Sequence, residues 1–489
     1  MKQKHSLTYN FFMNSILKAS GFLFPLISFP YVTRVLGAEG LGQVSFASAL
    51  VGYFSMAAML GIPTYGIRVC AQCRDDKERL SRTVQELLLI SLGTTVLAYI
   101  LLFFLLTGIP ALRERRSVIL ASSATILLTT IGVEWFYQAM EEYGYIAWRN
   151  MAGKALALLL LFCLVKKRED TFFYAGITVI GTSGSNLINF LRLRSYVTWK
   201  KTGKYQWKRH IRPMLTFFLF SVTTTVYTGL DSTMLGILSD DRQTGYYAAA
   251  VKLKNVLVSM ITALGAVLLP RASYYVEKGK MGKFYDTFRK ASRFVMLLAG
   301  PLTIYFMVEA GDTIGFLAGR EFLEAVPAMV IIMPTLLLIG FSQLIGMQLF
   351  IPLGREKDTV SSTFAGAVTD LGGNGLLIPG WGAAGAAMGT LMAEGIVLLV
   401  QLILLCKGQE GKRLLEKREK SSLKTPVISL FCAGTVLALW KMLWAQENAY
   451  FLNLLFSSLL FFGTYGMFLF IRKEPLIMVF LSQLKKEKK

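Results

Sequence analysis

Residues 83–107 read TVQELLLISLGTTVLAYILLFFLLT, an almost unbroken run of apolar residues. A stretch of about 20 such residues forms a helix long enough to cross the hydrocarbon core of a bilayer. Comparable runs recur from Phe11 to Ile471, separated by short polar connections. The chain has 54% hydrophobic and only 17% charged residues, too apolar a composition for an ordinary water-exposed surface. The sequence therefore predicts an all-α polytopic membrane protein.

The apolar runs define about fourteen candidate transmembrane helices. They are predicted at residues 10–33, 41–63, 83–107, 117–139, 143–165, 172–195, 213–238, 245–270, 291–310, 325–351, 358–379, 383–406, 425–445 and 449–471.

The longest polar interruption, Arg192 to Arg212, follows six of these spans and precedes eight. Transporters are often built from two related halves, and this count fits two six-helix bundles followed by a helix pair. We therefore predict four parts: an N-terminal six-helix bundle at 1–196, a basic cytoplasmic linker at 197–212, a second six-helix bundle at 213–406, and a C-terminal helix pair with a basic cytoplasmic tail at 407–489.

Basic residues set the predicted orientation. The even-numbered connections and the two termini carry most of the Lys and Arg residues, whereas the connection at 311–324 is net acidic. Because cytoplasmic connections are enriched in Lys and Arg, both termini are expected in the cytoplasm of a plasma-membrane protein. Arg113, Arg115 and Arg116, and the run from Lys166 to Arg168, are local exceptions that fall outside. The net charge of +22 is dispersed over the loops, which favours anionic lipid headgroups and not nucleic acid as its partner.

The cysteine and histidine residues do not indicate a metal site or a catalytic site. Five cysteines are scattered, and the close pair Cys70 and Cys73 lacks a second pair or a nearby histidine for zinc. Only His5 and His210 exist, both in polar segments, so a histidine-based catalytic site is not expected. The sequence predicts no metal site and no cofactor.

Ionisable residues inside predicted spans mark candidate function. A charge at membrane depth costs at least about 2.5 kcal/mol, so it normally faces a cavity or a partner. These residues are Lys18, Glu134, Lys154, Asp231, Lys252, Lys254, Asp370 and Glu394. Lysines from three helices in two different halves would form a central cationic chamber, which suits an anionic substrate such as a phosphate or diphosphate.

The alternatives for these charges are structural ion pairs and side chains that snorkel to an interface. Lys252 and Lys254 lie about 200° apart around a helix, so both cannot point into one cavity. Glu134 lies near a cytoplasmic end, where an interface position is equally reasonable. Asp231, Asp370 and Glu394 are open to two interpretations: coupling to Na⁺ or H⁺, or pairing with lysine.

Several motifs resemble those of a known family. They are FPLISFPYVTRVLGAEGLGQVSFASALVGYF at 24–54, GIPTYGIR at 61–68, EWFYQAMEEYGYIAWRN at 134–150, DSTMLG at 231–236, GYYAAAVKLKN at 245–255, LLPRASYY at 268–275, and GREFLEAVP followed by QLFIPLGREK within 319–357. The chain resembles bacterial polysaccharide flippases of the O-antigen exporter type. That family belongs to the superfamily that includes the lipid II flippase and the multidrug and toxin extrusion transporters.

The resemblance implies two six-helix bundles around a central cavity, with two extra C-terminal helices. It implies transfer of an undecaprenyl-diphosphate-linked oligosaccharide from the cytoplasmic to the outer leaflet by alternating access, for cell-surface polysaccharide biosynthesis. A polysaccharide polymerase and glycosyltransferases of the same pathway would be partners. The family-like positions are Arg34, Gly37, Glu39, Gly40, Gly42, Arg68, Arg149, Asp231, Lys252 and Arg271. With the lysines, Arg34, Arg68 and Arg149 complete the predicted cationic substrate site.

Four alternatives remain at this stage. A lipid II flippase shares the same physics and differs in headgroup. A cation-coupled multidrug exporter would be better served by a carboxylate-rich cavity. A membrane enzyme, such as a polymerase or ligase, would need a sizeable outer loop or a catalytic histidine. A scaffold of an envelope assembly complex would have no use for intramembrane lysines. The sequence thus favours a transporter over an enzyme.

Overall fold

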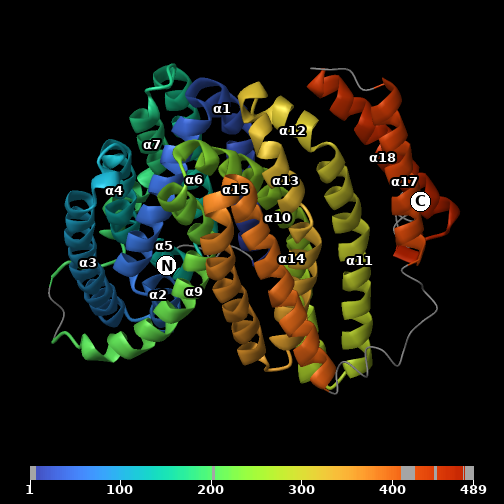
Figure 1. Cartoon of the computed structure of the whole chain (residues 1–489). Helices are drawn as coiled ribbons and strands as arrows, with labels where there is room; N and C mark the ends of the chain where they lie inside the picture. The colour runs from blue at the N-terminus through green and yellow to red at the C-terminus, as the bar shows by residue number, and fades with distance from the viewer. Residues whose placement is uncertain (1–6, 201–203, 409–423, 445–448, 477, 479–489) are drawn as a thin grey trace. The chain divides into compact units, whose positions relative to one another are not determined.

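The computed structural model describes residues 7–200, 204–408, 424–444, 449–476 and 478 (Figure 1). Every regular element in this part of the chain is a helix. The packing of the helices divides the chain into two units, Met1–Gly245 and Tyr246–Lys489. The predicted division at a linker of residues 197–212 is a different boundary and stays a prediction.

The first unit is built from long helices and several short ones. They are α1 (Leu7–Met59), α2 (Ile62–Gln72), α3 (Lys77–Gly108), η1 (Pro110–Leu112), α4 (Arg116–Gly132), α5 (Glu134–Ala139), α6 (Tyr143–Leu164), α7 (Thr171–Val179), the π-helix η2 (Ile180–Gly184), α8 (Asn186–Leu193) and α9 (Lys208–Leu238).

The second unit begins within α10. Its helices are α10 (Asp241–Glu277), α11 (Met281–Val308), α12 (Ala310–Leu317), η3 (Arg320–Ala325), α13 (Val326–Ile332), α14 (Thr335–Gln343), the π-helix η4 (Leu344–Phe350), α15 (Glu356–Lys407), α17 (Lys424–Trp444) and α18 (Tyr450–Ile471). Helices α17 and α18 pack against each other, and a core of Tyr305, Phe461 and Tyr465 joins α18 to α11.

A helix lies at each of the fourteen predicted segments. Among the described helices, nine are long and apolar enough to cross a membrane, or ten if the bent pair Arg320–Ile332 and Thr335–Phe350 counts as one span. The count is lower than fourteen partly because α1 and α15 each cover two predicted spans. An all-α polytopic membrane fold is therefore confirmed, while about fourteen separate crossings stay a prediction.

Glycines explain the two double-length helices. Gly37 within α1 has φ 69° and Gly382 within α15 has φ 52°, and at each of them two helices join across a kink. Positive φ values of this kind are favourable for glycine and costly for residues with a Cβ. The predicted connection between the spans 10–33 and 41–63 is thus a kink at Gly37.

Exposed apolar side chains show what surrounds the helices. On α3, Val96, Leu97, Phe103 and Phe104 are each more than half exposed. A contiguous apolar surface of this kind is unfavourable in water and suits contact with lipid chains. The described surface therefore agrees with the multi-pass membrane reading.

Candidate functional site

Helix α6 carries a cluster of polar side chains into the interior of the first unit. We define the α6 polar cluster as Ser20, Glu134, Arg149, Asn150, Lys154 and Ser185. Arg149, Asn150 and Lys154 come from α6, and their partners come from α1, the start of α5, and the residue that follows η2.

Arg149 is the most deeply buried charge of the cluster, with only 5% of its surface exposed. Its Nη2 donates to Glu134 Oε2 at 2.6 Å and to Asn150 Oδ1 at 3.0 Å. Its Nε and Nη1 atoms have no hydrogen-bond acceptor among the described residues. A guanidinium is permanently charged, and its planar fork of donors matches carboxylate and phosphate oxygens. The cluster thus contains donors suited to an oxyanion.

Lys154 lies five residues after Arg149 on α6 and has a different environment. Its Nζ donates to the Ser20 hydroxyl at 3.0 Å. Among the described residues, no carboxylate lies within ion-pair distance of this ammonium. Lys154 is also only partly buried. Its positive charge is therefore solvated by a neutral hydroxyl and remains available to an anion.

The π-helix η2 places the last member of the cluster. Ser185 follows η2 directly, and its hydroxyl donates to Asn150 Oδ1 at 3.2 Å. A Cβ on Gly153 would lie 3.2 Å from the Ser185 Cβ, so this glycine allows η2 to pack closely on α6. Single-turn π-helices inside α-helices are frequent at functional sites.

The other predicted site residues of the first unit lie elsewhere. The side chain of Lys18 is outside the described residues, although its backbone is part of α1. Arg34 and Arg68 are exposed, and Arg34 donates to the Pro30 carbonyl at 2.6 Å. Asp231 is buried in α9. The structure therefore brings Lys154, Arg149 and Glu134 together, and leaves Arg34 and Arg68 at the surface of the unit.

In the second unit, Lys252 is exposed and Lys254 is partly buried on α10. Asp370 and Glu394 are buried in α15. The different exposure of the two lysines agrees with their angular separation around the helix. Convergence of Lys18, Lys154 and Lys252 on one chamber stays a prediction.

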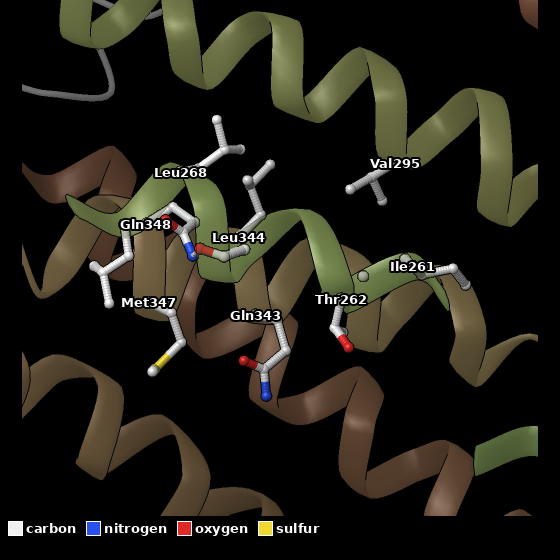
Figure 2. Close-up of a pocket in the computed structure, with 11 residues that line it drawn as sticks. Ile261, Thr262, Leu268, Val295, Gln343, Leu344, Met347 and Gln348 are labelled. Carbon is white, nitrogen blue, oxygen red and sulfur yellow. Dashed lines mark hydrogen bonds between the residues drawn. The ribbon is translucent and has the colours of Figure 1, made fainter. Parts of the chain in front are cut away.

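The second unit also contains a cavity of about 220 Å³ between α10, α11, α14 and η4 (Figure 2). Ile261, Leu268, Val295 and Leu344 supply apolar walls, and Gln343 and Gln348 supply polar groups. None of the predicted site residues lines it. The cavity is therefore not the predicted cationic site.

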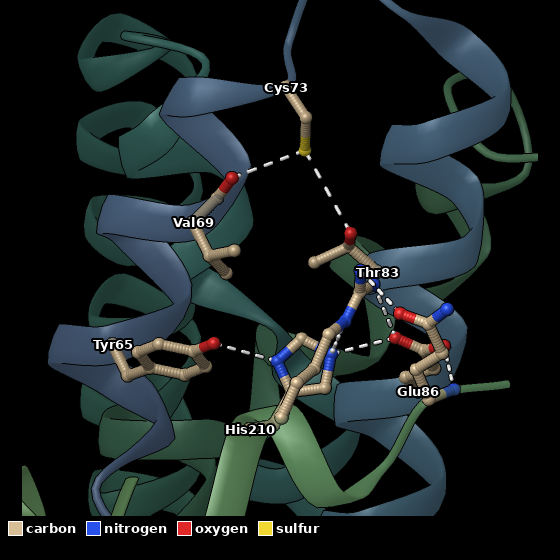
Figure 3. A network of polar contacts seen from close by, with 8 residues as sticks. Tyr65, Val69, Cys73, Thr83, Glu86 and His210 are labelled. Atoms are coloured by element: carbon tan, nitrogen blue, oxygen red, sulfur yellow. Dashed lines mark hydrogen bonds and ion pairs between the residues drawn. The ribbon is translucent and has the colours of Figure 1, made fainter. Parts of the chain in front are cut away.

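A second buried polar network in the first unit was not predicted from the sequence. Figure 3 shows His210 between Tyr65 and Glu86. The Tyr65 hydroxyl lies 2.7 Å from His210 Nδ1, and His210 Nε2 lies 2.7 Å from Glu86 Oε2. Arg209 donates to the same carboxylate oxygen at 2.7 Å, and the Gln206 backbone N–H donates to Glu86 Oε1 at 2.6 Å.

We call Tyr65, Glu86, Arg209 and His210 the α3–α9 clamp. It ties the start of α9 to α2 and α3. In the neutral tautomer with a proton on Nε2, His210 accepts from Tyr65 and donates to Glu86, so both contacts are satisfied. Glu86 is an acidic residue inside the predicted span 83–107, and that position was the available signal. The clamp is a structural junction, because its polar side chains form hydrogen bonds with one another.

No group of three or more His, Cys, Asp or Glu residues in the described part of the chain is arranged to hold a metal ion.

Residues 7–276 match the family described as polysaccharide biosynthesis protein. A protein of Escherichia coli (strain K12) named "Putative O-antigen transporter" is 22% identical over 360 residues, which is 73% of this chain and 86% of that protein. A protein of the same name from Shigella dysenteriae is 24% identical over 405 residues, covering 80% of this chain and 98% of that protein.

Two solved structures share the fold. A lipid II flippase in an inward closed conformation superposes with a TM-score of 0.75 at 13% identity, over 96% of this chain and 100% of that one. An inward-facing multidrug transporter of the multidrug and toxin extrusion family superposes with a TM-score of 0.64 at 14% identity, over 81% of this chain and 96% of that one.

Proposed function

Because the chain belongs to the family of polysaccharide biosynthesis proteins, we propose that it is a flippase for an undecaprenyl-diphosphate-linked oligosaccharide. It would move this glycolipid from the cytoplasmic to the outer leaflet by alternating access. The names of the two bacterial relatives support a transporter of surface polysaccharide, and the fold it shares with a lipid II flippase supports a lipid-linked substrate.

The observation that carries this proposal is the ammonium of Lys154. It lies inside a helical unit with only a serine hydroxyl as its hydrogen-bond partner in the described structure. A charge in such a position is costly unless it faces a cavity, a partner or a ligand. Charge-assisted bonds from lysine and arginine are the strongest contacts that a protein offers to phosphate oxygens. Lys154 and Arg149, both on α6, would therefore contribute to diphosphate binding, and Lys18 and Lys252 would complete the site.

The proposed mechanism depends on the cationic residues and on a relative movement of the two units. The diphosphate would enter from the cytoplasmic side, pair with these cationic residues, and leave when the units change their relative orientation. Binding in one orientation and release in the other requires differential affinity, which a change in the number of cationic contacts supplies. Coupling to Na⁺ or H⁺ would use Asp231, Asp370 or Glu394; loss of transport after selective collapse of one ion gradient tests this part.

Orientation and partners are further parts of the proposal. The distribution of Lys and Arg supports cytoplasmic termini, and reporter fusions at both ends test that placement. A polymerase and glycosyltransferases of the same pathway would act before and after the transport step, because a flipped repeat unit must be made inside and joined outside.

The direct experiment is depletion of the protein followed by leaflet-resolved measurement of the lipid-linked oligosaccharide. The account predicts accumulation in the cytoplasmic leaflet and recovery when the protein is supplied again. Transport at the normal rate in a strain without a paralogue contradicts it. A lipid II flippase is the second candidate because of the shared fold. Arrest of peptidoglycan synthesis on depletion, with normal surface polysaccharide, would select that candidate.

A further inference from the structure

The predicted span 117–139 is interrupted in the structure at Val133. This residue has φ 39° and ψ 38°, in the left-handed region. Such a conformation is unfavourable for a β-branched residue, and it persists only where the surrounding structure fixes it. We define the α4–α5 break as Gly132, the last residue of α4, and Val133, the residue before α5. The break sets the direction of the chain immediately before Glu134.

Asn189 on α8 replaces the hydrogen bond that the break removes. In a continuous helix the Phe136 N–H would bond to the Gly132 carbonyl, but here it bonds to the Val133 carbonyl at 2.9 Å. The Gly132 carbonyl accepts instead from Asn189 Nδ2 at 2.6 Å. Asn189 is fully buried, so loss of its amide would remove this donor from a carbonyl in the interior.

Two further contacts hold α8 against the break. The Tyr137 hydroxyl on α5 donates to the backbone carbonyl of Asn189 at 2.7 Å. A Cβ on Gly132 would lie 2.5 Å from Asn186 Cγ, so a side chain at this position would displace Asn186. Val133 and Tyr137 are themselves fully buried. The surrounding structure therefore fixes the strained residue from α5 and from α8.

The break delivers Glu134 to a defined position in the α6 polar cluster. Its Oε2 accepts from Arg149 at 2.6 Å, and its Oε1 accepts from Gln138 Nε2 at 3.4 Å. The carboxylate is also near enough for its charge to act on the Lys154 ammonium. Within the described residues, however, no ion pair joins Glu134 to Lys154. Glu134 thus neutralises Arg149 and leaves the charge of Lys154 available.

Loss of the break would change this distribution of charge. A continuous helix through residues 116–139 would relieve the strain at Val133 and would aim Glu134 in another direction, since each helical residue turns the chain by about 100°. A carboxylate that leaves Arg149 has Lys154 as an alternative partner in the same cluster. An ion pair there would compete with an anionic ligand for the ammonium.

We propose that Asn189 is a positioning residue for the anionic substrate: by fixing the α4–α5 break, it keeps Glu134 on Arg149 and away from Lys154. This inference rests on the proposed flippase function. Asn189 acts through the position of Glu134 and not through contact with the substrate. All these residues belong to the first unit.

Binding of undecaprenyl diphosphate to the purified full chain in detergent tests the proposal. Asn189→Ala should weaken binding about tenfold, because Glu134 then competes for Lys154. Adding Glu134→Gln to Asn189→Ala should restore the affinity to within about twofold of wild type, because a neutral amide does not compete with an anion. Unchanged or tighter binding by Asn189→Ala, or no recovery in the double variant, overturns the proposal.

A milder variant and a matched control separate positioning from general damage. Tyr137→Phe removes only the hydrogen bond to the Asn189 carbonyl, and it should weaken binding about threefold if Asn189→Ala does not fold. The control is Thr95→Val, which removes the buried 2.7 Å hydrogen bond between Thr95 and Thr130 on α4. The control should bind like wild type. Equal affinities of Tyr137→Phe and Thr95→Val overturn the positioning role.

A melting experiment tests the link between Asn189 and Glu134 without a ligand. Asn189→Ala and Glu134→Gln should each lower the melting temperature. The double variant should show a smaller decrease than the sum of the two, because Glu134 has already left its position once the break is released. Strictly additive decreases overturn the link.

The two measurements separate this proposal from the flippase proposal. If the wild-type protein binds no undecaprenyl diphosphate, the proposed substrate fails while the melting experiment still decides whether Asn189 positions Glu134. If the wild-type protein binds and Asn189→Ala binds equally well, only the positioning role fails.

Discussion

Arg149 and Glu134 form an ion pair of 2.6 Å although the arginine side chain is only 2% exposed. A buried charge of this kind is tolerated only when its partner is retained. The pair fixes α5 to α6 at the point where the α6 polar cluster begins. Its integrity is therefore a condition for the geometry around Lys154.

Replacement of Glu134 tests how much this ion pair contributes to the stability of the protein. Glu134→Ala should destabilise the protein by about 3 kcal/mol, because it leaves a buried guanidinium without a counterion. The control is Glu141→Ala, which breaks the Arg74–Glu141 pair whose side chains are 31% and 47% exposed. That change should cost about 1 kcal/mol or less. The measurement is the free energy of unfolding in detergent, and equal effects of the two changes would contradict the structural role of Glu134.

The α3–α9 clamp predicts a defined pH dependence of stability. Burial lowers the pKa of His210, and the neighbouring Glu86 carboxylate opposes this effect without reversing it. The unfolded chain therefore takes up a proton near its ordinary pKa of about 6.5, before the folded chain does. The contribution of His210 is complete above that pH and is lost as the pH falls toward the lowered pKa.

Thermal unfolding between pH 7.5 and pH 5 measures this contribution. The melting temperature of the wild-type protein should fall as the pH falls. The melting temperature of His210→Gln should fall less over the same range. Tyr65, Glu86 and Arg209 face the imidazole, so Tyr65→Phe serves as a control that removes one hydrogen bond and keeps the titrating group. Identical pH profiles for wild type and His210→Gln would rule out this role.

The close approach of α1 and α10 predicts that Gly42 cannot be replaced. Gly42→Ala places a Cβ 1.7 Å from the Asp241 carbonyl oxygen, so α10 must move away from α1 or the protein must fold poorly. Gly52→Ala on the same helix is the matched control, since no atom lies within 4 Å of its new Cβ. The melting temperature should fall for the first variant and stay equal or rise for the second. A Gly42→Ala protein as stable as the control would show that the contact is not required.

Within the second unit, Lys441 links α17 to the junction of α11 and α12. Its Nζ lies 3.3 Å from Glu309 Oε2 and 3.5 Å from Asp312 Oδ2, and the Glu309 side chain is fully buried. Lys441→Met should therefore destabilise by about 3 kcal/mol, and Glu309→Gln in the same chain should recover part of the loss. Unfolding of the two single variants and the double variant gives the coupling energy. Strict additivity of the two changes would contradict the ion pair.

Helix positions could be predicted from the sequence, because the apolar runs at 83–107 and 143–165 correspond closely to α3 and α6. The joining of two predicted spans into one long helix could not be predicted. Gly37 and Gly382 lie inside α1 and α15, and nothing in a hydropathy pattern distinguishes a kink from a loop. The number of separate crossings could not be predicted for the same reason.

The candidate site was predictable only in part. A lysine inside a predicted span, such as Lys154, is visible from its cost in the membrane. Its contact with Ser20 depends on packing between helices far apart in the sequence. Glu86 and His210 were missed as partners because Glu86 lies near the start of a predicted span and His210 lies in the predicted polar linker, and nothing in the sequence shows that the two meet.

The most direct test of the account is the transport rate of Lys154→Met in a strain that lacks other flippases. The control is Lys167→Met, an exposed lysine on the connection that follows α6. With equal amounts of both proteins in the membrane, the account predicts that Lys154→Met slows transfer of the lipid-linked oligosaccharide by about 10- to 100-fold, the loss expected for one charge-assisted contact, while Lys167→Met transports normally. Transport by Lys154→Met at the rate of the control would contradict a cationic substrate site on α6.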